Sequence, residues 1–309
     1  SDTDGAVTYS IVVGDLAGNP GVAVTTGTGS VTFDDTDPAR TSVTVASNNS
    51  LVTHAKSGNV VTVKLTTDVA VSQPVVVFKS GGAVLNNAAG RVIIYTNTNS
   101  PNKTEWSAAY TVDAADTDGL VSFDIDFSDL AGNAATTVTS VTDTSSVVVD
   151  TTAPTLTSVE IASSFSTITQ ASINDTIKID FVSNEIIADP AADATNLVVT
   201  FTSGVGVIDP SRVSYTNVSG DKINWTAQYD AASGDTEGAV SFAIAFNDIS
   251  GNAGTTVTAV TNSSSVTFDK TLPTLSNVGI VSSNPTDTLA IVNDVITVTF
   301  TAIEAVGTK

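Results

Sequence analysis

Acidic side chains recur in short turns that end in glycine. Three such turns are Asp2-Thr3-Asp4-Gly5, Asp116-Thr117-Asp118-Gly119 and Asp235-Thr236-Glu237-Gly238. Acids separated by one residue would point to one side of an extended backbone, and glycine permits the chain to turn. Such oxygen ligands suit Ca²⁺, which takes six to eight of them and tolerates irregular loops better than Mg²⁺ does. Zinc is disfavoured because the chain has no cysteine and one histidine, His54, which we expect on the surface.

The acidic turns belong to a longer repeat. A loop of the type Asp-x-Ala-Gly-Asn follows each turn, and after it an apolar run leads to aspartate and then proline. The loops are 15–19, 129–133 and 248–252, and the runs are 31–38, 147–154 and 266–273. This spacing predicts two full units, 39–154 and 155–273, preceded by the end of a unit (1–38) and followed by the beginning of another (274–309). We expect the chain to be cut from a longer array.

Within each unit the hydrophobic period is two, which is typical of strands with one buried face. Residues 120–129 alternate in this way, and so do 239–247, 7–13 and 296–300. About seven short strands in roughly 115 residues indicate an all-β fold of tandem immunoglobulin-like β-sandwiches in an elongated array. Trp225 is expected in a core. Residues 79–104, rich in Gly and Asn, are expected to form a long irregular stretch, with a mobile loop favoured over a projecting recognition surface.

The sandwich topology predicts where the acids lie. The turn between the fifth and sixth strands and the end of the last strand share one pole, and the next unit brings two of its loops to the same junction. Four or five carboxylates would then converge, with Asp118, Asp150 and Asp248 at the centre of the second junction. Over the whole chain the candidate Ca²⁺ ligands are Asp4, Asp15, Asp34, Asp37, Asp116, Asp118, Asp129, Asp150, Glu185, Asp235, Glu237, Asp248, Asp269 and Glu304. The alternative is that these acids are turn formers and solubilising charge.

Composition excludes several other functions. The 32 acidic side chains outnumber the 11 basic ones, for a formal charge of −21, which argues against binding nucleic acid or an anionic membrane surface. No apolar run approaches the length of a transmembrane helix, so we expect no membrane insertion. The absence of cysteine rules out disulfides and thiol catalysis.

No enzymatic activity is expected. Asp124 and Asp126 would lie about 6.5–7 Å apart on one strand face, a separation that suits an inverting glycosidase pair. Alanine occupies the equivalent positions, Ala243 and Ala245, in the next unit, and the strand face points to solvent. No nucleophile elbow, phosphate loop or metalloprotease motif occurs.

The repeat resembles the bacterial Ig-like repeats of giant, calcium-rigidified surface adhesins secreted by Gram-negative bacteria. The resemblance rests on Asp129–Asn133 with Val149–Pro154, and on Asp248–Asn252 with Phe268–Pro273. It implies an extracellular, bacterial cell-surface location and a role for Asp118, Asp150 and Asp248 in binding Ca²⁺ between units. The chain departs from the pattern at Ser250, at Lys270 and in the acidic linker 35–37.

The first functional hypothesis is therefore a structural stalk or filament segment, whose partners are the neighbouring units of the same chain. One alternative is a self-assembling fibre, sheath or surface layer with lateral self-association. Another is a ligand-binding module, with a glycan or a host or cell-surface receptor bound here or elsewhere in the parent protein. An accessory region of a large secreted enzyme is a fourth hypothesis.

Overall fold

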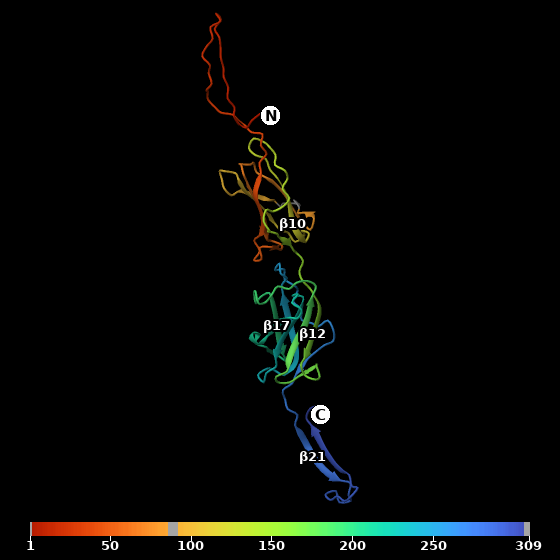
Figure 1. Cartoon of the computed structure of the whole chain (residues 1–309). Coiled ribbons are helices and arrows are strands. Elements are labelled where there is room, and N and C mark those ends of the chain that lie inside the picture. Colours follow the sequence, from red (N-terminus) through yellow and green to blue (C-terminus); the bar gives the residue numbers. More distant parts are fainter. Residues whose placement is uncertain (1, 86–91, 306–309) are drawn as a thin grey trace.

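The computed structural model describes residues 2–85 and 92–305. Figure 1 shows an N-terminal hairpin, two sandwiches and a C-terminal hairpin that follow one another along one axis. Nearly all the regular structure is β, and a single 3₁₀ turn, η1 (Pro210–Arg212), is the one helical segment in the described part of the chain. The predicted tandem β-sandwiches are thus confirmed. No helix in the described ranges is long and apolar enough to cross a membrane.

The first sandwich pairs a four-stranded with a five-stranded sheet. The four-stranded sheet has the order β3 (Arg40–Ser47), β5 (Val60–Thr67), β9 (Glu105–Thr111), β8 (Ile94–Asn97). The five-stranded sheet has the order β4 (His54–Ala55), β11 (Val148–Val149), β10 (Gly119–Asp126), β6 (Val75–Ser80), β7 (Ala83–Val84). Lettered along the chain as A, A′, B, C, C′, D, E, F and G, these strands give sheets A-B-E-D and A′-G-F-C-C′.

The second sandwich repeats this order. Its four-stranded sheet is β12 (Leu156–Ser163), β14 (Thr176–Ser183), β18 (Asn224–Asp230), β17 (Ser214–Asn217). Its five-stranded sheet is β13 (Gln170–Ala171), β20 (Thr267–Phe268), β19 (Gly238–Phe246), β15 (Leu197–Ser203), β16 (Gly206–Val207). Register repeats as well: Trp106 lies opposite Leu65 in the first sandwich, and Trp225 lies opposite Phe181 in the second.

The cores follow from the alternating patterns. In β19, Val240, Phe242, Ile244 and Phe246 are buried between the sheets while the residues between them face outward. Each such side chain contributes about 1.5–3 kcal/mol to folding through removal of apolar surface from water. Trp225 is 4% exposed, which confirms its prediction as a core residue.

Two expectations need correction. Among the described residues each sandwich has nine strands rather than seven, because the short strands A′ and C′ carry too few residues to show a period. The stretch 79–104 is not irregular throughout: β7 and β8 lie within it, and its residues 86–91 lie outside the described part. His54, on β4, is partly exposed, which is compatible with the expected surface position.

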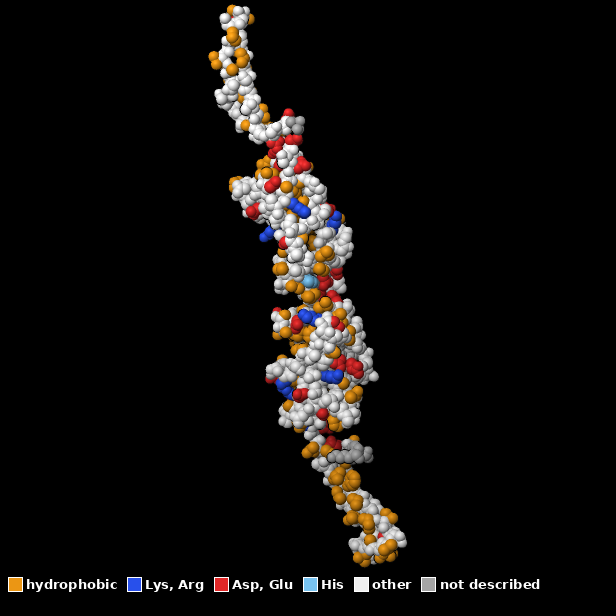
Figure 2. Space-filling model, in the orientation of Figure 1, with side chains coloured by type: hydrophobic (Ala, Val, Ile, Leu, Met, Phe, Trp, Pro, Cys, Tyr) orange, Lys and Arg blue, Asp and Glu red, His pale blue; other side chains and the backbone are white. Residues whose placement is uncertain are grey.

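The predicted buried faces of 7–13 and 296–300 are exposed. Residues 7–13 form no named strand, only the isolated bridge from Ile11 to Val24 beyond β1 (Gly5–Ala6) and β2 (Thr32–Phe33). Strand β22 (Ile296–Ala302) pairs with β21 (Leu275–Ser282), yet Phe300 is 53% exposed. No second sheet among the described residues covers either hairpin, and Figure 2 shows apolar side chains on the surface of the C-terminal one.

Candidate metal centre between the two sandwiches

Three carboxylates converge where the first sandwich meets the second. Asp150 directly follows β11 of the first sandwich, Glu185 follows β14 of the second, and Asp248 follows β19. One carboxylate oxygen from each lies within 4.8 Å of the other two, and among described residues no other group of three or more potential ligands is this close. Asp248 is buried and the other two are half-buried. Two loops of one sandwich and the last strand of the other therefore build the cluster.

Burial and mutual repulsion shift the pKa values of two carboxyls in the cluster, Glu185 and Asp248. Burial raises the pKa of the Glu185 carboxyl from 4.5 to about 7, and the charges of Asp150 and Asp248, with a smaller effect from Asp118, act in the same direction. Burial also raises the pKa of Asp248, although its hydrogen bonds with Asn252 oppose that shift. At the corresponding position of the first sandwich, the pKa of Asp129 is lowered. Burial acts to raise it, but hydrogen bonds from Asn133, Gly132 and Ala131 outweigh that effect. The shifts show that gathering these carboxylates at the second junction is unfavourable by itself.

The junction is also held by direct contacts that the sequence analysis missed. The side-chain amide of Asn252 donates to the Asp248 carboxylate at 2.8 Å and to the backbone carbonyl of Asp150 at 2.9 Å. The Ser250 hydroxyl donates to the Asp150 carboxylate at 2.9 Å. From the first sandwich, Asn49 donates to the Ser250 carbonyl at 2.8 Å, and the Lys56 ammonium donates to the Gly251 carbonyl at 2.5 Å.

The recurring asparagine of the Asp-x-x-Gly-Asn loop was the signal for these contacts. In the loop of the first sandwich, Asn133 donates to Asp129 at 2.9 Å and to the Asp34 carbonyl of the preceding segment at 3.1 Å. The same side chain therefore closes its own loop and reaches the end of the unit before it. In the N-terminal hairpin, Asn19 donates to Asp15 at 2.9 Å, which is the same local closure.

Replacing Asn252 with alanine is expected to loosen the second junction with and without metal. The change removes the bond to the Asp150 carbonyl and leaves the buried Asp248 short of a donor, at a cost of about 1 kcal/mol, or roughly fivefold in an opening equilibrium. Limited proteolysis of the linker 151–155 would measure this as faster cleavage. Asn19→Ala is the matched control, since Asn19 has the same place in the motif; equal cleavage rates for both variants would contradict the prediction.

The second acid of each acidic turn faces the linker. Asp118 accepts hydrogen bonds from the Thr151 backbone at 2.7 Å and from the Thr152 hydroxyl at 2.5 Å. Glu237 accepts from the Lys270 backbone at 2.8 Å and the Thr271 hydroxyl at 2.7 Å in the same way. In the N-terminal hairpin Asp4 accepts from the Asp35 backbone at 2.8 Å and from the Thr36 hydroxyl. These carboxylates fix the start of each linker beside the junction.

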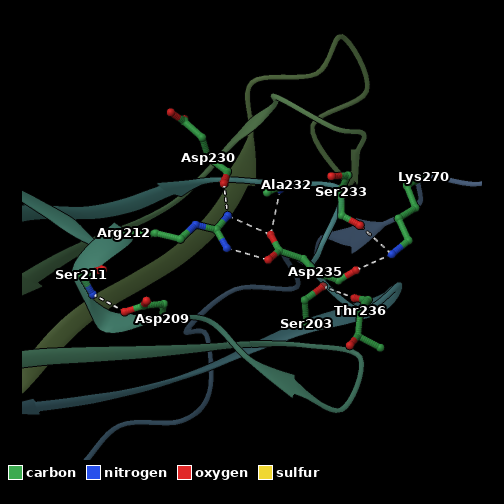
Figure 3. A network of polar contacts seen from close by, with 10 residues as sticks. All are labelled: Ser203, Asp209, Ser211, Arg212, Asp230, Ala232, Ser233, Asp235, Thr236 and Lys270. Carbon is green, nitrogen blue, oxygen red and sulfur yellow. Dashed lines mark hydrogen bonds and ion pairs between the residues drawn. The ribbon is translucent and has the colours of Figure 1, made fainter.

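In the two sandwiches the first acid of the turn lies elsewhere, contrary to the expectation that both acids point to one side. Asp116 accepts the Tyr110 hydroxyl at 2.8 Å within its own sandwich. Asp235 is paired with Arg212 at 2.6 and 2.9 Å (Figure 3). The alternation fails because residues 112–118 form a turn rather than a strand. The structure brings none of Asp116, Asp118 and Asp235 into the cluster, so the prediction that Asp118 lies at its centre is wrong.

The remaining candidates occupy equivalent places at the other junctions. Asp34 and Asp269 correspond to Asp150, and each accepts a hydrogen bond from the second residue after it. Asp37 is exposed in the first linker, and Glu304 follows β22 as Glu185 follows β14. At the first junction, the position equivalent to Glu185 is Val69, which lies two residues after β5 as Glu185 lies two residues after β14. The first junction therefore lacks the third carboxylate of the second.

The donor set decides which ion would fit the second junction. Three carboxylates from loops, partly open to solvent, offer only hard oxygen ligands, and no histidine or cysteine contributes. The raised pKa values of Glu185 and Asp248 mean that their charged forms are disfavoured there, and a divalent cation would offset that cost. These residues fit a hard dication such as Ca²⁺.

Sheets A-B-E-D and A′-G-F-C-C′ define both complete units as immunoglobulin-like β-sandwiches. No protein-family model matches the chain, and a comparison with curated proteins also gives no match. Solved structures similar to it include the D00-D0 domain of intimin (12% identity, 73% of this chain, 100% of that chain, TM-score 0.26). Rst D1-D2 (14%, 76% and 100%, TM-score 0.31) and the titin domains z1z2 in complex with telethonin (13%, 77% and 98%, TM-score 0.26) are further examples.

Proposed function

We propose that the chain is a segment of an extracellular stalk on a bacterial cell surface, stiffened by Ca²⁺ at the junction between its sandwiches. The observation that carries the proposal is the convergence of Asp150, Glu185 and Asp248 from two successive sandwiches on one point. The end-to-end arrangement in Figure 1 suits a protein that contributes length. The resemblance of the 129–133 and 149–154 repeats to surface-adhesin repeats supports the cellular location.

The residues at the junction have distinct roles in this function. Asp150, Glu185 and Asp248 would hold the ion, which supplies positive charge and joins oxygen ligands from both sandwiches. Asp118 accepts hydrogen bonds from Thr151 and Thr152 of the linker, which fixes the direction of the chain after strand β11. Asn252 places Asp248 against Asp150. Without a cation, repulsion among the three carboxylates favours separation of the sandwiches.

The extent of stiffening depends on how many elements cross the junction. Besides the linker, contacts come from the loop 248–252 of the second sandwich and from Asn49 and Lys56 of the first. These contacts are hydrogen bonds from a few side chains. A bound cation that joins carboxylates of both sandwiches should therefore increase the stiffness of the junction considerably. Stability along the array is approximately a sum of unit and junction terms.

Calcium titration of the full chain tests the proposal. We expect a saturable binding heat in calorimetry and a longer maximum dimension in small-angle X-ray scattering with Ca²⁺ than with excess chelator. Glu185→Gln removes one ligand charge, so it should weaken Ca²⁺ binding by about tenfold or more, equivalent to at least about 1.4 kcal/mol. Asp143→Asn is the control, since Asp143 is an exposed acid that is hydrogen-bonded to Ser145.

Two outcomes would refute the calcium mechanism. One is scattering that is unchanged between Ca²⁺ and chelator, which would leave the sandwiches as a plain array. The other is equal loss of affinity in Glu185→Gln and Asp143→Asn, which would mean that Ca²⁺ responds to net charge and not to the cluster.

A further inference from the structure

The two hairpins at the ends of the chain correspond to different strands of one sandwich. In the N-terminal hairpin, residues 5–33, an isolated bridge joins Ile11 to Val24. The first sandwich has the same bridge between Ile125 and Val138, where strand F meets the segment that leads to strand G. In the C-terminal hairpin, β21 pairs with β22 as strand A (β12) pairs with strand B (β14), with a register shift near the same end. One hairpin is therefore an F–G pair and the other an A–B pair.

The apolar faces of both hairpins are exposed, although the residues at the same positions of the repeat are buried in the sandwiches. Ile11 is 55% exposed, whereas Ile125 is 0% exposed. Ile280 is 70% exposed, whereas Ile161 is 3% exposed. Six further residues of the hairpins are exposed although their counterparts are buried: Val7, Tyr9, Val13, Val278, Val298 and Phe300. Each hairpin thus presents half of a sandwich core to solvent.

The complete sandwiches show what covers such a face. In the first sandwich, the Val43 backbone of strand A donates to the Thr142 hydroxyl at 2.9 Å, and the Thr142 backbone donates to the Val43 carbonyl at 2.9 Å. Val159 and Thr261 form the same two hydrogen bonds, each at 2.9 Å, in the second sandwich. Strand A is therefore bound directly to the segment between strands F and G of the same unit, and the apolar faces of both sheets meet in one core.

The end hairpins carry the two sides of this contact separately. Val278 of β21 has the position of Val159 in β12. Thr28 lies nine residues after the asparagine of the Asp-x-Ala-Gly-Asn loop in the N-terminal hairpin, as Thr142 does in the first sandwich. The hairpins lie at opposite ends of the elongated molecule (Figure 1), so they cannot meet within one copy. A second copy can bring the missing side to each of them.

The carboxylates of the second junction also have counterparts that are divided between the two ends. Asp15 of the N-terminal hairpin has the position of Asp248 in the motif, and Asp269 and Glu304 at the C-terminal end have the positions of the other two cluster residues. Joining the ends of two copies would bring these three acids to one junction. Their repulsion would oppose the contact unless a cation offsets it, a point that rests on the proposed function.

We propose that the C-terminal hairpin of one copy packs on the N-terminal hairpin of a second copy, so that chains associate head to tail. Strands A and B of one copy then cover strands F and G of the next, and Val278 binds Thr28 as Val159 binds Thr261. The two surfaces differ, so the contact is heterologous and extends into a linear filament. Neither hairpin supplies strands C to E, so the contact is smaller than a sandwich core, and we expect a Kd of about 10 µM.

Sedimentation velocity of the full chain tests the proposal. In Ca²⁺, we expect the sedimentation coefficient to rise between about 1 and 100 µM protein. Ile280→Asp and Ile11→Asp each place a charge on one apolar face, so each should weaken association by about tenfold or more. Val205→Asp is the control, since Val205 is 91% exposed in the turn between β15 and β16, and it should associate like the wild type. Tryptophan emission confirms that the sandwiches remain folded in each variant.

Mixing the two hairpin variants tests the head-to-tail geometry. Each variant keeps one intact hairpin, so an equimolar mixture of Ile280→Asp and Ile11→Asp should form a 1:1 complex and no longer species. General apolar aggregation would give no such complex. The proposal is overturned by any of three results: a chain that stays monomeric at about 100 µM in Ca²⁺, a hairpin variant that associates like the wild type, or a mixture without the 1:1 complex.

The calcium dependence of association is tested separately. Glu304→Gln should remove the strengthening of association by Ca²⁺, whereas Glu185→Gln, which lowers Ca²⁺ binding within each copy, should leave association intact. Association that is equal in Ca²⁺ and in chelator would overturn the shared carboxylate junction but support the contact between the hairpins. The failure of this inference is thus distinguishable from failure of the calcium site between the two sandwiches.

Discussion

Replacing Gly119 with alanine is expected to lower the free energy of unfolding of the first sandwich by about 3–4 kcal/mol. Gly119 ends the acidic turn at a φ of +142°, and a Cβ there would lie 2.6 Å from the Cα and 2.9 Å from the N of Gly81. Both obstacles are backbone atoms, so no side-chain movement relieves the clash. The second sandwich repeats this close approach, with Gly238 against Gly204 at 3.0 Å.

The same substitution should also disturb the junction. Asp118 directly precedes Gly119, and its carboxylate holds Thr151 and Thr152 of the linker. Any shift of the turn away from Gly81 moves Asp118 and releases those donors. We therefore expect faster cleavage of the linker in Gly119→Ala under conditions where the sandwich is still folded.

The measurement is urea unfolding followed by Trp106 fluorescence in a Trp225→Phe background. Gly58→Ala is the matched control in the same sandwich: its φ is +87°, but a Cβ there meets nothing within 4 Å. The control should lose only about 1 kcal/mol from backbone strain. Equal losses in both variants would show that the close approach of the two glycines is not what restricts position 119.

The sequence was sufficient to predict the arrangement of elements and which loops meet. A period of two in residues such as 239–247, repeated at fixed intervals, indicates strands, and sandwich topology then assigns Asp118, Asp150 and Asp248 to the centre of one junction, with Glu185 on a neighbouring loop. The structure groups Asp150 and Asp248 with Glu185. Asp118 instead accepts hydrogen bonds from the linker threonines. Strand alternation and pole assignment are properties of the backbone, so they can be inferred without knowing any side-chain contact.

Side-chain direction within turns was not predictable in the same way. Asp116 and Asp118 are two residues apart, yet one accepts from Tyr110 and the other from the linker threonines, because the turn breaks strand alternation. The role of Asn252 was missed for a related reason: its amide serves two acceptors, one of them in the preceding sandwich. Such choices depend on which donors happen to lie nearby in three dimensions.

Replacing Arg212 with methionine is expected to lower the free energy of unfolding of the second sandwich by about 2–3 kcal/mol. Asp235 is 9% exposed, and its two carboxylate oxygens accept hydrogen bonds from the two terminal guanidinium nitrogens of Arg212. The guanidinium also lies 5.7 Å from the centre of the Tyr229 ring. Removing it leaves the nearly buried carboxylate with only the Ala232 N–H and the charge of Lys270 as compensation, and breaking one side of such a pair costs more than the pair itself contributes. The loss stays below that of a fully buried pair because Arg212 is partly exposed.

The pH dependence gives this prediction a distinctive signature. Arg212 holds the pKa of the Asp235 carboxyl below its ordinary value of 3.8. A carboxyl whose pKa is lowered by folding stabilises the protein above its unfolded-state pKa, and that contribution is lost as the pH falls through the folded-state pKa. The stability difference between wild type and Arg212→Met should therefore be full at pH 5–7 and shrink below about pH 3.8.

Unfolding followed by Trp225 fluorescence in a Trp106→Phe background would measure this difference at pH 7, 5 and 3. Lys178→Met is the control in the same sandwich, because Lys178 and Asp180 form a 2.7 Å ion pair in which both side chains are more than 40% exposed. Exposed pairs contribute at most about 1 kcal/mol, so this variant should be nearly as stable as wild type. A pH-independent loss in Arg212→Met would mean that packing of the side chain over Tyr229, and not its charge on Asp235, stabilises this end of the sandwich.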